Sequence, residues 1–168
     1  MTKIPRHILS LFGEFIVEHN KMDHKLKHFL AGFVEDQRIG HLLTSSQAFE
    51  FIKKRVNSVY KHIIEDNALT KRWDDLQGEM AELNEVRNDI AHSTIDIDPD
   101  SKEFLVMTRF TEHTVLKLGQ KAKSYELSAL KAYVSRLKKL NRKLSFLLHT
   151  TYKKHHDIIY YNGPGMMF

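Results

Sequence analysis

Arg87, Asn88 and His92 are the residues whose types and spacing best suit a chemical role. They lie in the segment 85–93, EVRNDIAHS, where a long helical pattern ends. An arginine is a permanent cation with a planar fork of donors, an asparagine amide can donate and accept, and a histidine can take up or release a proton. Together these groups suit the binding and cleavage of a phosphodiester.

The same segment can also be the end of an ordinary amphipathic helix. Arg87 would then pair with a neighbouring acid, and His92 would lie at the helix C-terminus, where positive charge is favoured. On an ideal helix, five steps separate Arg87 from His92 by about 140° around the axis and about 7.5 Å along it. We therefore expect the two side chains to point apart. One chain then holds a poorly closed site, unless the helix frays at His92 or a second copy completes a symmetric dimer.

Other sites for chemistry are weaker in this sequence. The best metal candidate is the pair His24 and His28, which share a helix face, but no third ligand accompanies them. The chain has no cysteine, no glycine-rich phosphate loop and no serine in a Gly-x-Ser-x-Gly setting. We predict neither a metal site nor a cofactor.

Positive charge is concentrated in one segment. Residues 117–154 contain 11 Lys and Arg against one acidic residue, whereas residues 1–116 contain 15 against 19. This asymmetry favours an anionic partner, with nucleic acid ahead of a membrane surface because no lipid-facing aromatic stripe accompanies it. A solvated helix face is the alternative. The basic positions concerned are Arg136, Lys138, Lys139, Arg142 and Lys143.

The elements that must position these residues follow from hydrophobic spacing. Apolar residues at helical spacing predict helices over 5–20, 23–39, 45–65 and 67–92, and a long basic helix from Ser124 through Leu148. Between the last two, residues 94–98 and 103–110 have a strand pattern around Pro99-Asp100, which predicts a β-hairpin.

We therefore predict an all-α fold, an antiparallel helical bundle of about five helices with a small β-hairpin insertion after the helix that carries Arg87. Residues 1–154 would form a single domain, and residues 155–168 an irregular tail. No apolar run is long enough to span a bilayer, and the start does not read as a signal peptide, so we expect no membrane association and a cytoplasmic location.

Arg87-Asn88, followed by three residues and His92, resembles the motif of the HEPN superfamily. Proteins of this superfamily are similar in having a bundle of four or five helices, the motif at the end of a helix, and a final amphipathic helix after a small hairpin or loop. The resemblance covers most of residues 5–150, and its specific part is the motif.

The resemblance implies a metal-independent endoribonuclease that acts as a homodimer, with the motifs of both copies lining one cleft. His92 would act as general base or acid on the ribose 2′-hydroxyl and the leaving oxygen. Arg87 would bind the scissile phosphate and stabilise the charge that develops there. Asn88 would orient His92 or contact the RNA, and the basic helix would bind the RNA backbone.

The resemblance also implies a biological setting and an alternative. Toxins and phage-defence effectors of this type suggest an inhibitory antitoxin-like partner. Toxins paired with a nucleotidyltransferase carry a tyrosine two places after the histidine, but Thr94 stands there, which argues against regulation by tyrosine modification. The alternative is a non-catalytic HEPN-like dimer that binds RNA, a nucleotide or a partner protein.

Overall fold

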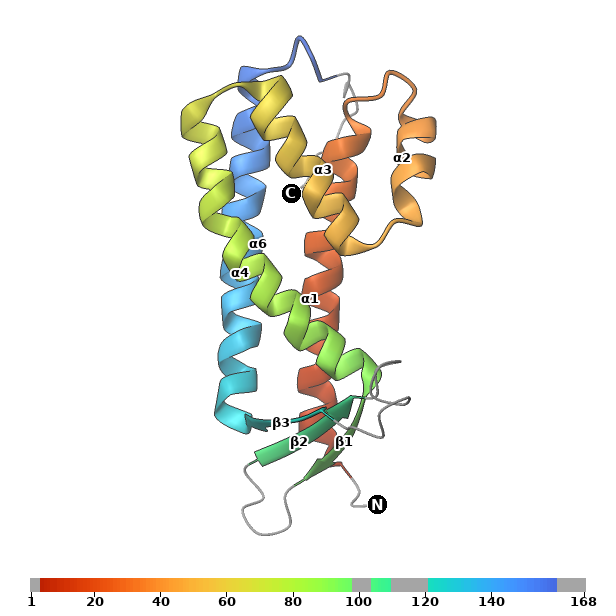
Figure 1. Cartoon of the computed structure of the whole chain (residues 1–168), viewed down its shortest axis with the longest axis vertical. Coiled ribbons are helices and arrows are strands. Elements are labelled where there is room, and N and C mark those ends of the chain that lie inside the picture. Colours follow the sequence, from red (N-terminus) through yellow and green to blue (C-terminus); the bar gives the residue numbers. More distant parts are fainter. Residues whose placement is uncertain (1–3, 98–103, 110–120, 160–168) are drawn as a thin grey trace. The chain divides into compact units, whose positions relative to one another are not determined.

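Helices make up most of the chain (Figure 1). A computed structural model describes residues 4–97, 104–109 and 121–159. The helices are α1 (Arg6–Ala31), α2 (Gln37–Ser45), α3 (Phe49–Val59), the π-helix η1 (Tyr60–Ile64), α4 (Asn67–His92) and α6 (Leu127–Lys154), and the strands are β1 (Ser93–Ile97), β2 (Phe104–Arg109) and β3 (Lys121–Glu126). Within this part of the chain, no helix combines the length and the apolar character needed to cross a membrane. The predicted turn at Pro99-Asp100 and residues 160–168 of the predicted tail lie outside the described residues.

α1 is one continuous helix where two were predicted. The expected break at His19-Asn20 is wrong, because the buried apolar stripe continues through Met22 and Leu26, both with no exposed surface. Asp23 does not cap a new helix. Its carboxylate instead lies 2.8 Å from Lys27 Nζ, one turn further along the same helix, an arrangement that supports a helix rather than ending it.

α4 begins and ends where the sequence indicates. The Asp66 carboxylate accepts hydrogen bonds from the backbone N–H groups of Ala68 (3.0 Å) and Leu69 (3.1 Å) and so caps the first turn. The last helical residue is His92, and β1 follows it directly. The residues of the predicted phosphodiester site therefore lie in the last two turns of α4.

The region before α6 differs from its prediction. Ser124, expected to start the last helix, lies in β3, where it pairs with Val106 of β2. β2 also pairs antiparallel with β1, which gives a three-stranded sheet in the order β1-β2-β3. The backbone of residues 121–126 is committed to this sheet, so α6 starts only at Leu127.

The chain forms two compact units. The first contains Met1–His19 and Ala81–Lys138, and the second contains Asn20–Met80 and Lys139–Phe168. The expected single domain over residues 1–154 stays a prediction. The described core of the first unit consists of Ile8, Phe12, Phe15, Leu83, Val86, Leu130, Val134 and Leu137.

The core of the second unit is built around stacked aromatic rings. Tyr60 lies between Phe29 and Trp73, with ring centroids 5.7 Å and 5.3 Å apart and planes within 14° of parallel. The Tyr60 hydroxyl, 2.9 Å from Thr151 Oγ1, has its hydrogen-bond partner inside the core. Trp73 Nε1 donates to Asn57 Oδ1 at 3.3 Å, so the polar atoms of Tyr60 and Trp73 both have partners within the unit.

Gly40 permits a close approach between α2 and the end of α1. A Cβ atom added at Gly40 would lie 2.7 Å from the Ala31 carbonyl oxygen, which is closer than contact allows. A Cβ atom at Gly78, also within a helix, would meet nothing within 4 Å. The same substitution should therefore have opposite effects at the two positions.

We expect Gly40→Ala to lower the free energy of unfolding by about 1–3 kcal/mol through overpacking against the Ala31 backbone. Gly78→Ala, its matched control, should raise it by about 0.5–1 kcal/mol, because alanine restricts the unfolded chain and favours the helix. Urea titration of both variants measures the two values. Equal effects of the same sign would contradict the close packing of α2 on Ala31.

Candidate active site at the end of α4

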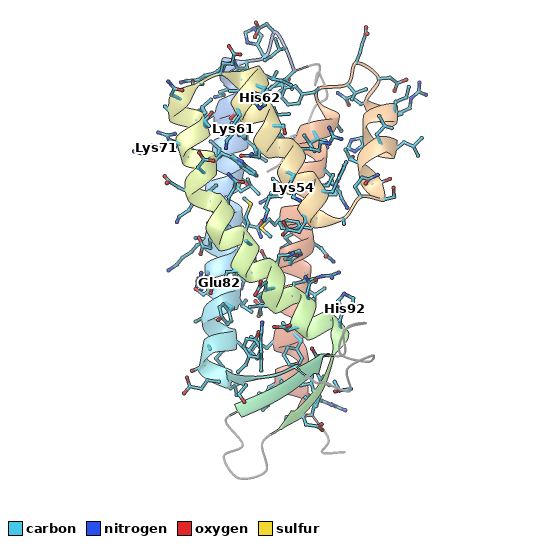
Figure 2. The ribbon with its side chains drawn as sticks, viewed as in Figure 1. Lys54, Lys61, His62, Lys71, Glu82 and His92 are labelled. Atoms are coloured by element: carbon cyan, nitrogen blue, oxygen red, sulfur yellow. The ribbon has the colours of Figure 1, made fainter. Side chains whose placement is uncertain are left out.

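The structure brings Arg87, Asn88 and His92 together. Arg87 Nη1 donates to Asn88 Oδ1 at 3.1 Å and lies 3.4 Å from His92 Nε2. Figure 2 shows His92 at the C-terminal end of α4. Arg87 and Asn88 are half-buried and His92 is exposed, so the cluster faces solvent at one end of the helix.

The expectation that Arg87 and His92 point apart is therefore wrong. It was based only on the directions in which side chains leave an ideal helix. The arginine side chain is long enough to reach from its own position around the helix to the imidazole of His92. Since Nη1 can only donate, its contact with His92 Nε2 is a hydrogen bond when that nitrogen carries a lone pair, in the neutral tautomer with hydrogen on Nδ1. One chain thus holds the cation, the amide and the imidazole in one cluster.

Asp89 fixes the end of α4 against β3. Its buried carboxylate accepts hydrogen bonds from the Tyr125 hydroxyl (2.5 Å) and from Lys123 Nζ (2.9 Å). Burial, and next the hydrogen bond to Asp89, raise the pKa of Tyr125 well above its usual range, so the phenol keeps its proton and remains a donor. These hydrogen bonds hold β3, more than 30 residues away in sequence, against the turn of α4 between Arg87 and His92.

Sequence reasoning did not single out Asp89, Lys123 or Tyr125. One signal was present, because Asp89 lies three residues after Val86, on the stripe that the helix buries. An acidic residue on a buried stripe requires a partner. The partners themselves could not be identified, because they lie on a strand that was not predicted.

The predicted basic face is divided into paired and unpaired cations. Arg136 makes two hydrogen bonds to the Glu82 carboxylate, at 2.8 Å and 2.6 Å, and its guanidinium lies 5.5 Å from the Tyr133 ring centre. Through its hydrogen bonds, Arg136 holds the pKa of the Glu82 carboxyl below its usual range. Lys138 pairs with Glu14 at 2.5 Å. These two cations are therefore neutralised within the first unit.

The remaining three cations of the predicted face belong to the second unit. Lys139, Arg142 and Lys143 are exposed. Across residues 4–97, 104–109 and 121–159, none of the three has a hydrogen bond or ion pair. They are the part of the predicted RNA-binding surface that is available to an external anion.

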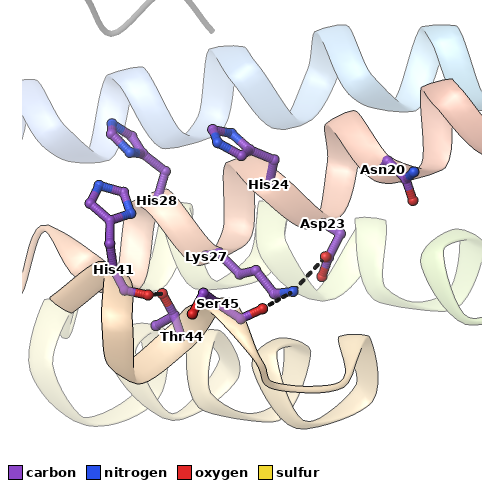
Figure 3. Close-up of a pocket in the computed structure, with 8 residues that line it drawn as sticks. All are labelled: Asn20, Asp23, His24, Lys27, His28, His41, Thr44 and Ser45. Atoms are coloured by element: carbon purple, nitrogen blue, oxygen red, sulfur yellow. Dashed lines mark hydrogen bonds and ion pairs between the residues drawn. The ribbon is translucent and has the colours of Figure 1, made fainter. Parts of the chain in front are cut away.

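A histidine cluster lies in a pocket of the second unit, with a volume of about 310 Å³ (Figure 3). His24 and His28 stack on α1 with ring centroids 6.1 Å apart, and His41 of α2 lies 5.1 Å from His28. No group of three or more His, Asp or Glu residues in the described chain is arranged to hold a metal ion. The pocket is lined by Asn20, Asp23, His24, Lys27, His28, His41, Thr44 and Ser45.

The environment of His28 opposes protonation. Burial is the main cause that lowers the pKa of His28 below its usual value, and the neighbouring rings of His41 and His24 lower it further. Sequence reasoning found the pair on α1 but missed His41, which belongs to a different helix. The cluster is thus a packed contact between α1 and α2 that is best maintained when the rings are neutral.

Asp89→Ala should destabilise the protein by about 1.5–3 kcal/mol, because it removes a charged acceptor from two hydrogen bonds and leaves the Tyr125 hydroxyl without its partner. Thermal or urea denaturation measures this loss. Asp96→Ala, at an exposed position on β1, is the matched control and should stay within about 0.5 kcal/mol of wild type. Equal stability of the two variants would show that the carboxylate does not hold β3 to α4.

The stability of the second unit should fall on acidification. In the unfolded chain His28 takes up a proton near its usual pKa, whereas in the folded chain its pKa is lower. The neutral ring therefore contributes fully to the free energy of unfolding above about pH 6.5, and this contribution is lost progressively below that pH. We expect the urea midpoint of wild type to drop more between about pH 7.5 and about pH 5.5 than that of His28→Gln. His62→Gln, at an exposed ring on η1 (Figure 2), should behave as wild type. A wild-type midpoint that changes no more than that of His28→Gln would contradict the prediction.

Comparisons with known proteins assign no family to this chain. No model of a known protein family matches it, and neither does any curated protein or solved structure. The features of this chain that bear on its function are therefore the contacts among Arg87, Asn88 and His92 and the resemblance of their spacing to the motif.

Proposed function

We propose that the chain is a metal-independent endoribonuclease of the HEPN type, built as an antiparallel helical bundle with a hairpin after the motif helix. The observation that carries the proposal is the cluster of Arg87, Asn88 and His92 at the solvent-facing end of α4. An acid–base group and a forked cation within one hydrogen-bond length of each other suit cleavage of a phosphodiester by its own neighbouring hydroxyl.

In the proposed reaction, RNA supplies the nucleophile. His92 Nε2 takes the proton from a ribose 2′-hydroxyl, and the 2′-oxygen attacks the adjacent phosphorus. The bond from phosphorus to the 5′-oxygen breaks, and that oxygen accepts a proton from the His92 imidazolium as it leaves, which returns the histidine to its neutral form and gives a 2′,3′-cyclic phosphate and a 5′-hydroxyl. DNA has no 2′-hydroxyl and should not react. No metal-bound water is required, because water does not attack in this step.

Arg87 would hold the phosphate during this step. Its guanidinium can donate two parallel hydrogen bonds to non-bridging oxygens and stabilise the charge that grows on them in the transition state. Asn88 Oδ1, which accepts from Arg87 at 3.1 Å, would orient the guanidinium. When the phosphate draws Arg87 away from His92, the Nε2 lone pair becomes available to act as the base.

A homodimer would add a second imidazole to the same cleft. A single histidine must serve first as base and then as acid, whereas two copies of the motif facing each other would provide one of each. The proposed setting is a toxin or phage-defence effector with an antitoxin-like inhibitor. The alternative function is a non-catalytic dimer that binds RNA, a nucleotide or a partner protein with the same cluster.

We expect the purified protein to cleave RNA in the presence of EDTA and to leave 2′,3′-cyclic phosphate ends. His92→Ala and Arg87→Ala should each lower the rate by about 10²–10⁴-fold, as expected for the loss of an acid–base group or a charge-stabilising donor. His62→Ala removes an exposed histidine from η1 and should retain full activity. A product analysis by mass spectrometry identifies the ends.

RNA binding without cleavage, unchanged by His92→Ala, would reject the nuclease and favour the non-catalytic alternative. Sedimentation of the same sample tests the dimer separately. Full cleavage activity in a strict monomer at micromolar concentration would remove the shared cleft but keep the nuclease, because one chain already unites the three side chains.

A further inference from the structure

Phe146 is a large apolar side chain that the second unit leaves in solvent. It lies on α6 and is 64% exposed. Lys143 lies one helical turn before it, and Arg142 lies four residues before it, so both cations share its side of the helix. An exposed aromatic ring beside cations is the arrangement with which proteins stack the bases of single-stranded nucleic acids and contact their phosphates.

Phe146 forms one wall of a pocket of about 390 Å³ within the second unit. The floor is apolar, because Leu76 of α4 and Leu147 of α6 line it and are 7% and 2% exposed. The rim is charged and consists of Arg72 and Asp75 from α4 and Lys143 from α6. In the described part of the chain, none of these three rim residues makes an ion pair or side-chain hydrogen bond.

The positive charge around this pocket favours an anionic ligand. α6 contains no acidic residue along its whole length. Lys139 and Arg142, exposed on the same helix, extend the positive surface beyond the rim. A polyanion with flat apolar faces complements a cationic rim over an apolar floor, whereas an apolar peptide would leave these cations without counter-charges.

We propose that this pocket binds one base of single-stranded RNA, stacked on Phe146, while Arg72 and Lys143 contact the phosphates on either side of it. This proposal adds a binding site to the proposed nuclease, and it rests on that proposed function only for the identity of the ligand as RNA. The binding site lies in the second unit, apart in sequence from the Arg87 cluster, so binding here and cleavage there can be measured independently.

Asp75 gives the site a preference among bases. A carboxylate can only accept, so it favours cytosine, whose 4-amino group is a donor where uracil has a carbonyl oxygen, and gains less from uracil, whose base edge offers only the N3–H as a donor. The same negative charge repels phosphate. Removing it should therefore erase the preference for cytosine and at the same time strengthen binding of uracil-containing RNA.

The test measures binding of short oligo(C) and oligo(U) RNA by fluorescence anisotropy, in a His92→Ala background that prevents cleavage. Phe146→Ala should weaken oligo(C) binding by about 10-fold, the loss of one base–aromatic stack. Arg72→Gln with Lys143→Gln should weaken it further and flatten its salt dependence. Asp75→Ala should give oligo(C) and oligo(U) equal affinities.

Matched controls come from α3 and η1. Phe51→Ala removes another exposed phenylalanine with a neighbouring cation, since it is 43% exposed and lies 5.0 Å from the Arg55 guanidinium carbon. Lys54→Gln with Lys61→Gln removes two exposed positive charges (Figure 2). Both controls should keep binding within about two-fold of the parent. Photo-crosslinking of oligo(C) that contains 5-iodocytidine, followed by peptide mass spectrometry, should identify Phe146.

The outcomes test the RNA-binding site and the nuclease activity separately. Cleavage by wild type with binding unchanged in the Phe146 and Arg72/Lys143 variants would overturn this site and leave the nuclease standing. Weakened binding in those variants without cleavage by wild type would support the site and reject the nuclease. Duplex RNA that binds as tightly as oligo(C), with the same loss in Phe146→Ala, would overturn stacking, as would the absence of RNA binding in every form of the protein.

Discussion

The candidate active site depends on the hydrogen bonds that the Asp89 carboxylate accepts. This carboxylate is buried two residues after Arg87 and three before His92, and it holds Tyr125 and Lys123 of β3. A buried carboxylate without donors would be costly. The requirement for these donors therefore fixes the last turn of α4 relative to the sheet. β1 continues from the same turn with Ser93 opposite Arg109, so the backbone is held on both sides of His92.

The sequence was informative where local signals and tertiary packing agree. The end of α4 at His92 was predicted because helical spacing changes there to alternation, and the structure confirms that boundary. The break within α1 was wrong because Asn20 and Asp23 are only local stop signals, which the burial of Met22 and Leu26 overrides. β3 was missed because the segment Lys121–Glu126 has too few apolar residues to show a strand pattern.

The candidate site shows the same limits. The three residues were found from their types and spacing, but their contact depends on how far the Arg87 side chain reaches, which helix periodicity does not describe. The basic face was found from composition, but composition cannot show that Glu82 and Glu14 neutralise Arg136 and Lys138 from 54 and 124 residues away. Phe146 and Arg72 were not recognised, because the pocket that unites them lies between residues of two helices distant in sequence.

The contact between Arg87 and His92 also has a consequence for control of the protein. Without substrate, the Arg87 guanidinium lies 3.4 Å from His92 Nε2, the nitrogen that would act as base in the proposed reaction, so the guanidinium would have to move before that nitrogen could take up a proton. In the proposed nuclease, a phosphate that competes for Arg87 would both bind and free that nitrogen, which would couple recognition of the substrate to activation of the base. If the chain is such a nuclease with an inhibitor, the inhibitor would not need to cover the whole site. It would be sufficient for the inhibitor to hold Arg87 in contact with His92.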